Sequence, residues 1–316
     1  MMAHSETHRR FGVGQGGFTL IELLISLTVG LVLVGASLNL AVSVFRGSEG
    51  DKLREEVYRA GRFVGMSLNR DLQTAGVGIE SVQTFGTLST FSDTLVILHV
   101  PWEPSLAPAH SINPPFGVNN PLDPGGTCGA TCIDLNKDSG GNFDFAVGDL
   151  ARLQVNAERH LILITGVRDL GGSTFQLQFL PDTTLLHYEA AFQGGLQLDR
   201  FATTVQKLQP IVYYVDSGVL FRADRLDTSG DLIPSPMAYG VTAWDADLIF
   251  TDLDEAPTVN LTDADVTNDF DDLLGVRISA MIGTNRPDIR VAGGGLFARA
   301  YEWRLTPRNL MYERNR

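Results

Sequence analysis

The feature that most constrains this chain is the apolar stretch from Phe18 to Phe45, in which Glu22 is the only ionisable residue. At a rise of about 1.5 Å per residue, a helix over this stretch is about 42 Å long, and the hydrocarbon core of a bilayer is about 30 Å thick. Its length and composition therefore predict a membrane-spanning helix.

The flanks of the stretch predict its orientation and leave two alternatives open. Arg9 and Arg10 precede it, so the positive-inside bias keeps the N-terminus cytoplasmic and places the rest outside. An uncleaved signal anchor, or a signal peptide cut within residues 34–41, would also fit an apolar run. Glu22 speaks against both, because a carboxylate at mid-membrane costs roughly 2.5 to 3.5 kcal/mol, less near an end, and normally has a positively charged partner.

Residues Gly17-Phe18-Thr19-Leu20-Ile21-Glu22 resemble the class III signal of type IV pilins and type II secretion pseudopilins. The resemblance implies that a prepilin peptidase cuts after Gly17 and methylates the amine of Phe18. It also implies that Glu22 neutralises the N-terminal ammonium of a neighbouring subunit, which offsets the cost of burying its charge. Residues 1–17 are then a discarded leader.

The net charge of the chain limits the class of partner that its exported part can bind. The formal net charge of the 316 residues is −13, and removing residues 1–17, with Arg9, Arg10 and Glu6, leaves about −14. An acidic chain without a basic stripe argues against nucleic acid as a partner.

A second helical pattern follows the span. Gly47 and Gly50 predict a bend or melted segment, because glycine lowers helix stability by up to about 1 kcal/mol relative to alanine. Residues 51–75 then carry an apolar stripe at a spacing of three or four, with Gly76 placed to end the helix. The stripe consists of Leu53, Val57, Ala60, Val64, Leu68 and Leu72.

In the chain after this second helical pattern, short apolar runs follow one another with little helical pattern between them. We therefore predict a mainly antiparallel sheet and an α+β fold. We expect strands at Thr94–Val100, Asp149–Val155, His160–Thr165, Thr174–Leu180, Ile211–Val215, Val219–Ala223, Val241–Phe250, Gly275–Ile282 and Leu296–Leu305. The expected parts are a leader (1–17), a transmembrane or filament-core helix (18–45), its amphipathic second half (46–76) and an exported β-rich domain (77–316).

Residues 101–145 read as a long loop with two candidate sites. Cys128 and Cys132, the only cysteines, predict a small disulfide ring in an oxidising compartment, with a two-ligand metal site as the alternative. After the cysteines, residues with oxygen-bearing side chains stand at alternate positions, as in a calcium-binding loop. An acidic turn exposed to solvent explains the same pattern. These side chains are Asp134, Asn136, Asp138, Asn142 and Asp144.

Shorter segments resemble the PilW family of minor pilins, and several are shared with the pseudopilin GspJ. They are Arg70–Gly76, Val147–Asp149, Leu220–Arg222, Gly240–Val241 and Pro307–Asn309. Pro307 stands where that family has leucine. The resemblance implies a structural subunit that starts assembly of a type IV pilus at or near its tip, with other minor pilins and the major pilin.

The residues do not favour an enzyme. The six histidines are scattered and form no metal-spaced pair, and no nucleophile motif or phosphate loop is present. We therefore expect a non-enzymatic minor pilin anchored in the inner membrane with a periplasmic domain and then part of a surface pilus. A minor pseudopilin is the alternative, and an anchored adhesin a third. No cofactor is expected, apart from the calcium alternative.

Overall fold

The computed structural model describes most of the chain. The described residues are 17, 19–82, 85–91, 93–101, 109–113, 120–121, 132–156, 158–181, 197–198, 202–260, 268–288, 290–291 and 295–310. Their contacts divide the chain into two units, residues 1–52 and residues 53–316.

Helix α1 runs from Leu20 to Leu72 and belongs to both units. It continues as α-helix through Gly47, Ser48 and Gly50, so the predicted interruption there is wrong. It ends at Leu72, three residues before the predicted end, and turns follow up to Gly78, with Gly76 at a positive φ of 76°.

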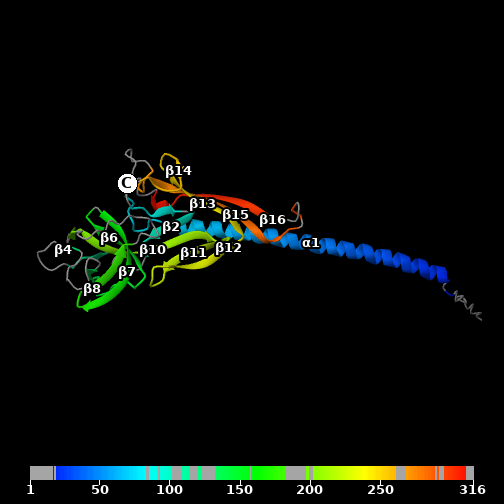
Figure 1. Ribbon diagram of the computed structural model, residues 1–316, viewed down its shortest axis with the longest axis horizontal. Helices are drawn as coiled ribbons and strands as arrows, with labels where there is room; N and C mark the ends of the chain where they lie inside the picture. Colours follow the sequence, from blue (N-terminus) through cyan, green and yellow to red (C-terminus); the bar gives the residue numbers. More distant parts are fainter. Residues whose placement is uncertain are drawn as a thin grey trace, which may run out of the picture. The chain divides into compact units, whose positions relative to one another are not determined.

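The rest of the described chain is strand, turn and a short closing turn of helix (Figure 1). The strands are β1 (Leu88–Phe91), β2 (Thr94–His99), β3 (His110–Ser111), β4 (Asn120–Pro121), β5 (Cys132–Asn136), β6 (Leu150–Val155), β7 (Glu158–Gly171), β8 (Thr174–Pro181), β9 (Gln197–Leu198), β10 (Thr203–Asp216), β11 (Val219–Leu226), β12 (Leu232–Tyr239), β13 (Val241–Phe250), β14 (Glu255–Ala256), β15 (Leu273–Pro287) and β16 (Leu296–Leu305).

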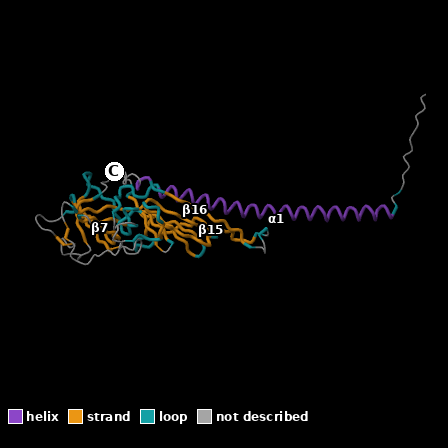
Figure 2. Tube along the Cα trace, turned by 90° about the horizontal axis from the view of Figure 1, so that it is seen from above, coloured by secondary structure: helices purple, strands orange, loops and turns teal. Residues whose placement is uncertain are grey.

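The strand pairs of the described residues are all antiparallel, which confirms the predicted fold class. The largest sheet has the order β1-β2-β10-β6-β7-β8-β5; in addition, β11 and β3 pair with β10, and β12 pairs with β11. A second sheet has the order β14-β13-β15-β16, and β4 pairs with β9. Figure 2 shows β15 and β16 side by side in the second sheet.

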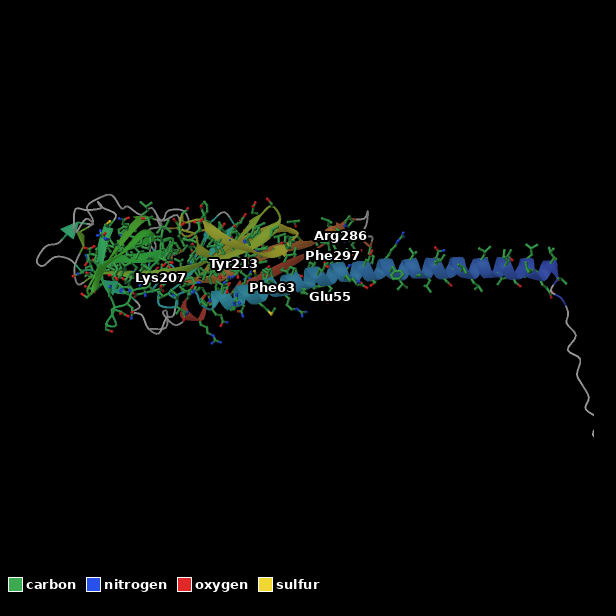
Figure 3. The ribbon with its side chains drawn as sticks, turned by 90° about the horizontal axis from the view of Figure 1, so that it is seen from below. Glu55, Phe63, Lys207, Tyr213, Arg286 and Phe297 are labelled. Atoms are coloured by element: carbon green, nitrogen blue, oxygen red, sulfur yellow. The ribbon has the colours of Figure 1, made fainter. Side chains whose placement is uncertain are left out.

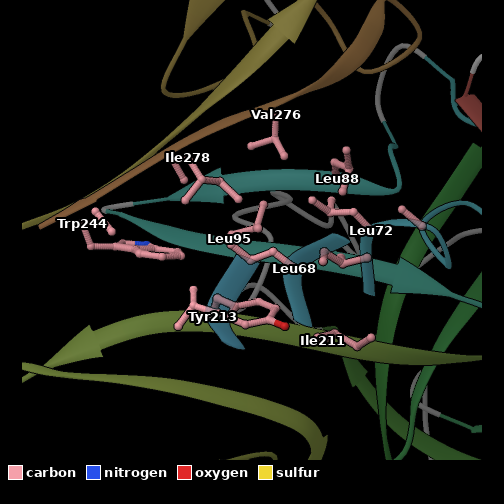
Figure 4. Packing of buried hydrophobic residues seen from close by; sticks show 14 of the residues in the cluster. Leu68, Leu72, Leu88, Leu95, Ile211, Tyr213, Trp244, Val276 and Ile278 are labelled. Atoms are coloured by element: carbon pink, nitrogen blue, oxygen red, sulfur yellow. The ribbon is translucent and has the colours of Figure 1, made fainter. Parts of the chain in front are cut away.

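The main core forms where the residues of α1 after Lys52 meet both sheets. Val57, Val64, Leu68 and Leu72 are buried in one cluster with residues of β1, β2, β10, β13 and β15. Figure 4 shows Leu68 and Leu72 of the helix next to Leu95 and Tyr213 of the large sheet, with Val276 and Ile278 of the second sheet nearby. The apolar stripe predicted from the sequence therefore faces the core, while Glu55 and Phe63 lie on the exposed face of the helix (Figure 3).

Two glycines of α1 let the second sheet approach the helix. A Cβ atom at Gly61 would overlap the ring of Tyr301, and one at Gly65 would crowd the indole of Trp303. The two rings stack on each other in β16, and the Tyr301 hydroxyl donates a hydrogen bond to the Val57 carbonyl at 3.0 Å. Glycine is thus required here for packing space.

A buried carboxylate joins α1 to the large sheet. Asp71 is 3% exposed, and its Oδ2 accepts hydrogen bonds from the Tyr213 hydroxyl at 2.6 Å and from Arg222 Nε at 2.5 Å. Tyr213 and Arg222 are direct partners on β10 and β11. Arg70 Nε donates to the other oxygen at 3.0 Å. One helix residue thereby fixes its position against two adjacent strands.

Other segments singled out in the sequence also form joints. Asn309 donates a hydrogen bond to the Ala75 carbonyl at 3.0 Å. At Gly240, which has a φ of 74°, a Cβ atom would overlap the Gly283 carbonyl oxygen. A Cβ atom at Gly148 would overlap the Asp227 carbonyl oxygen in the same way. The predicted connection before Thr94 contains β1, and the predicted loop 101–145 contains β3, β4 and β5.

We predict that Asp71→Asn lowers the free energy of unfolding by about 3 kcal/mol or more at pH 7, because it leaves Arg222 without its buried partner. Denaturant unfolding of the full chain in detergent measures this, with the exposed Asp216→Asn on β10 as control. An effect equal to that of the control would contradict the assignment.

The same pair predicts a pH dependence. Burial alone would raise the pKa of Asp71, but the hydrogen bonds from Arg222 and Tyr213 and the charge of Arg222 outweigh it and hold that pKa below its ordinary value. The stabilisation is therefore complete above the unfolded pKa of about 3.9 and is lost as the pH falls through the lower folded pKa. The difference between wild type and Asp71→Asn should shrink over that acid range.

Candidate processing and assembly site

Thr19 and Glu22 cap the start of α1 through reciprocal hydrogen bonds. Glu22 Oε2 accepts hydrogen bonds from the Thr19 backbone N–H at 3.0 Å and from the Thr19 hydroxyl at 2.9 Å. The Glu22 N–H in turn donates to Thr19 Oγ1 at 3.3 Å. This is a capping box, in which a threonine before the helix and a glutamate three residues later satisfy each other's free N–H groups. Glu22 thus has local partners within its own chain.

Sequence reasoning assigned Glu22 only a partner in another subunit and missed the role of Thr19. The Thr-x-x-Glu spacing before an apolar run is a known signal for a capped helix start and could have revealed it. Gly17 is exposed before this cap. Phe18 lies outside the described residues, so the cut and the methylation assigned to this bond stay predictions.

The part of α1 that follows exposes its apolar side chains. Leu20, Leu31, Leu40 and Phe45 are each more than 60% exposed, and the helix is long and apolar enough to cross a membrane. Two of its hydroxyls bond back within the helix, from Ser26 to the Glu22 carbonyl at 2.7 Å and from Thr28 to the Ile25 carbonyl at 2.8 Å. Hydroxyls satisfied in this way are suited to a hydrocarbon environment.

The capped start, the single carboxylate and the apolar helix lie within one segment. Residues 13–38 match the model of the prokaryotic N-terminal methylation motif. The match to this methylation motif includes Gly17, Phe18 and Glu22, and it covers only the N-terminal part of the chain. It implies processing by a prepilin peptidase.

Two further comparisons were made with the full sequence. A type IV-like pilin from Thermus thermophilus is similar over 51% of this chain and 86% of its own length, at 12% identity and a TM-score of 0.23. No curated protein matches the sequence.

The predicted disulfide falls partly outside the described residues. Cys132 is buried at the start of β5, whereas Cys128 belongs to a segment that the structure does not describe. The pairing therefore stays a prediction.

The predicted calcium ligands contact different partners. Asp134 Oδ1 accepts from Gln176 at 2.9 Å in the neighbouring strand β8, and Asn136 donates to Ser111 and to the Ile112 carbonyl. Asp138 Oδ1 accepts from the Gly140 and Asn142 N–H groups in a local turn, and Asp144 pairs with Lys207. The side chains of Asp134 and Asn136 lie in a strand, and calcium binding there stays a prediction.

We predict that Thr19→Val frays the first turn of the helix, because it removes a cap worth about 1 kcal/mol. Amide hydrogen exchange of residues 20–23 in detergent micelles should become roughly fivefold faster, since about 1 kcal/mol corresponds to that ratio. Thr28→Val is the matched control, because the Thr28 hydroxyl bonds its own helix carbonyl and caps nothing. Equal exchange in the two variants would contradict the capping role.

Proposed function

We propose that this protein is a minor pilin of the PilW type, a structural subunit that helps to start assembly of a type IV pilus at or near its tip. The observation that carries the proposal is the methylation motif at residues 13–38, placed on an exposed apolar helix whose only carboxylate in the span is Glu22. Its partners are the prepilin peptidase, other minor pilins and the major pilin.

The proposed mechanism depends on an exchange of hydrogen-bond partners at Glu22. In the single chain, its carboxylate accepts from Thr19. In a filament, the N-terminal ammonium of a neighbouring subunit would approach the same carboxylate, and a charged donor forms a stronger hydrogen bond than a neutral one. Helix packing through residues 23–44 would supply the remaining contact area, and the glycines 30 and 35 have open space around their Cα atoms.

In the exported domain, the segments that resemble the PilW family contact one another, which supports the PilW type. Asp71 of the first segment binds Arg222 of another, and Ala75 binds Asn309 of the last. Residues that are separate in the sequence but touch in the fold are the ones a shared fold would retain. The acidic charge of the chain favours protein partners over nucleic acid.

The alternative is a minor pseudopilin of a type II secretion system, which would share the helix, the cut and the glutamate. An anchored adhesin is a weaker third candidate. In all three cases the role is non-enzymatic, and the protein stays in the inner membrane with a periplasmic domain until it is assembled.

Deletion of the gene separates the first two functions. Sheared surface pili are measured by immunoblot for the major pilin, together with type II substrates in the medium. Loss of pili with secretion intact supports the pilus role, and loss of secretion with normal pili would make the protein a pseudopilin. No change in either would contradict a role in assembly.

We predict that Glu22→Gln abolishes filament association while membrane anchoring is retained. Glutamine can still complete the capping box, so this variant removes the charge and keeps the cap. Glu22→Ala removes both, and Glu55→Ala, at an exposed helix position, is the control. Fractionation of membranes and sheared filaments measures the outcome, and wild-type incorporation of Glu22→Gln would contradict the proposed ion pair.

A further inference from the structure

A group of three carboxylates lies just before β15, outside every site predicted from the sequence. Asp269, Asp271 and Asp272 each place a carboxylate oxygen within 4.8 Å of the others. They lie in the described segment 268–272, directly before β15, which starts at Leu273.

The burial of Asp269 is a separate observation that indicates a missing partner. Asp269 is 2% exposed, and its Oδ1 accepts one hydrogen bond, from the Asp271 N–H at 3.2 Å. Its Oδ2 is fully buried without a hydrogen-bond partner in the described structure. The preceding residue, Asn268, has a second buried oxygen in the same condition. Buried charged oxygens are normally paired or coordinate a metal, because burying an unpaired charge is costly.

Two further carboxylates, of Asp271 and Asp272, lie beside the buried Asp269. Like charges held this close repel each other unless a proton or a cation lies between them.

We propose that Asp269, Asp271 and Asp272 form a binding site for one calcium ion. Calcium takes six to eight oxygen ligands at about 2.3 to 2.6 Å, so oxygens on opposite sides of the ion are up to about 5.2 Å apart. The observed separation fits that limit. Magnesium demands shorter distances of about 2.0 to 2.1 Å and strict octahedral geometry, and it usually keeps several waters.

The position of the group indicates what the ion stabilises. Thr251, just after β13, donates to Asp272 Oδ1 at 3.4 Å, and the Asn260 N–H donates to the Asn268 carbonyl at 2.8 Å. Phe270, between the acidic residues, is buried in the main core. Calcium would therefore fix residues 268–272 just before β15, whatever filament the protein belongs to.

The test uses the purified full chain in detergent, with calorimetric titration of CaCl2 and melting curves in CaCl2 and in EDTA. We expect one bound calcium and a higher melting temperature in calcium than in EDTA, with a smaller rise in MgCl2. Asp271→Asn should weaken calcium binding at least tenfold. Because Asp271 is exposed, this variant avoids the folding risk of a change at buried Asp269.

Asp138→Asn is the matched control, since it changes the acidic turn that the sequence alone had suggested. It should bind calcium as the wild type does. The proposal is overturned if the wild type shows no binding heat and equal melting in calcium and EDTA. It is also overturned if Asp138→Asn loses binding while Asp271→Asn keeps it.

Discussion

One helix that must suit two surroundings is the constraint on which this structure depends. Up to Phe45 its large apolar side chains are exposed, whereas between Leu53 and Leu72 one apolar stripe packs into the domain core. The change in pattern within a single element explains why the domain needs specific joints to the helix. The Tyr301 ring over Gly61 and the Asp71 carboxylate under Tyr213 and Arg222 supply them.

Three carboxylates illustrate how differently the chain satisfies negative charge. Glu22 accepts hydrogen bonds from a neutral residue of its own helix cap, which a stronger, charged donor can replace. Asp71 is paired with an arginine and a tyrosine inside the fold, so it has a structural role. Asp269 is buried with an unpartnered oxygen beside two further carboxylates. These differences separate a proposed assembly residue, a structural residue and a proposed cation ligand.

Much of the fold could be predicted from the sequence, because apolar periodicity depends on local spacing. The nine expected strands all overlap observed ones, and the helix stripe faces the core. Strand β12 was missed because it contains Pro234 and Pro236, which an edge strand tolerates, and among the described strands β12 pairs with β11 alone. Strand β5 was missed because its alternation from Ile133 to Asn136 has the same period of two in a strand as in an ion-binding loop.

Whether a candidate site could be predicted from the sequence likewise depends on whether its signal is local. Glu22 is evident from the sequence because it is the only ionisable residue in a long apolar run. The group around Asp269 resembles any acidic surface turn until its burial is known. Likewise, the contact of Asp71 with Arg222 joins residues 151 positions apart, and no local pattern predicts it.

The most direct test of the account is the mass of the N-terminal peptide of the protein extracted from membranes. In the wild-type strain we expect a peptide that begins at Phe18 and carries one added methyl group on its amine. In a strain without prepilin peptidase, the leader should remain attached. An N-terminus within residues 35–42, or an uncut leader in the wild-type strain, would contradict the account and identify an ordinary signal sequence or anchor.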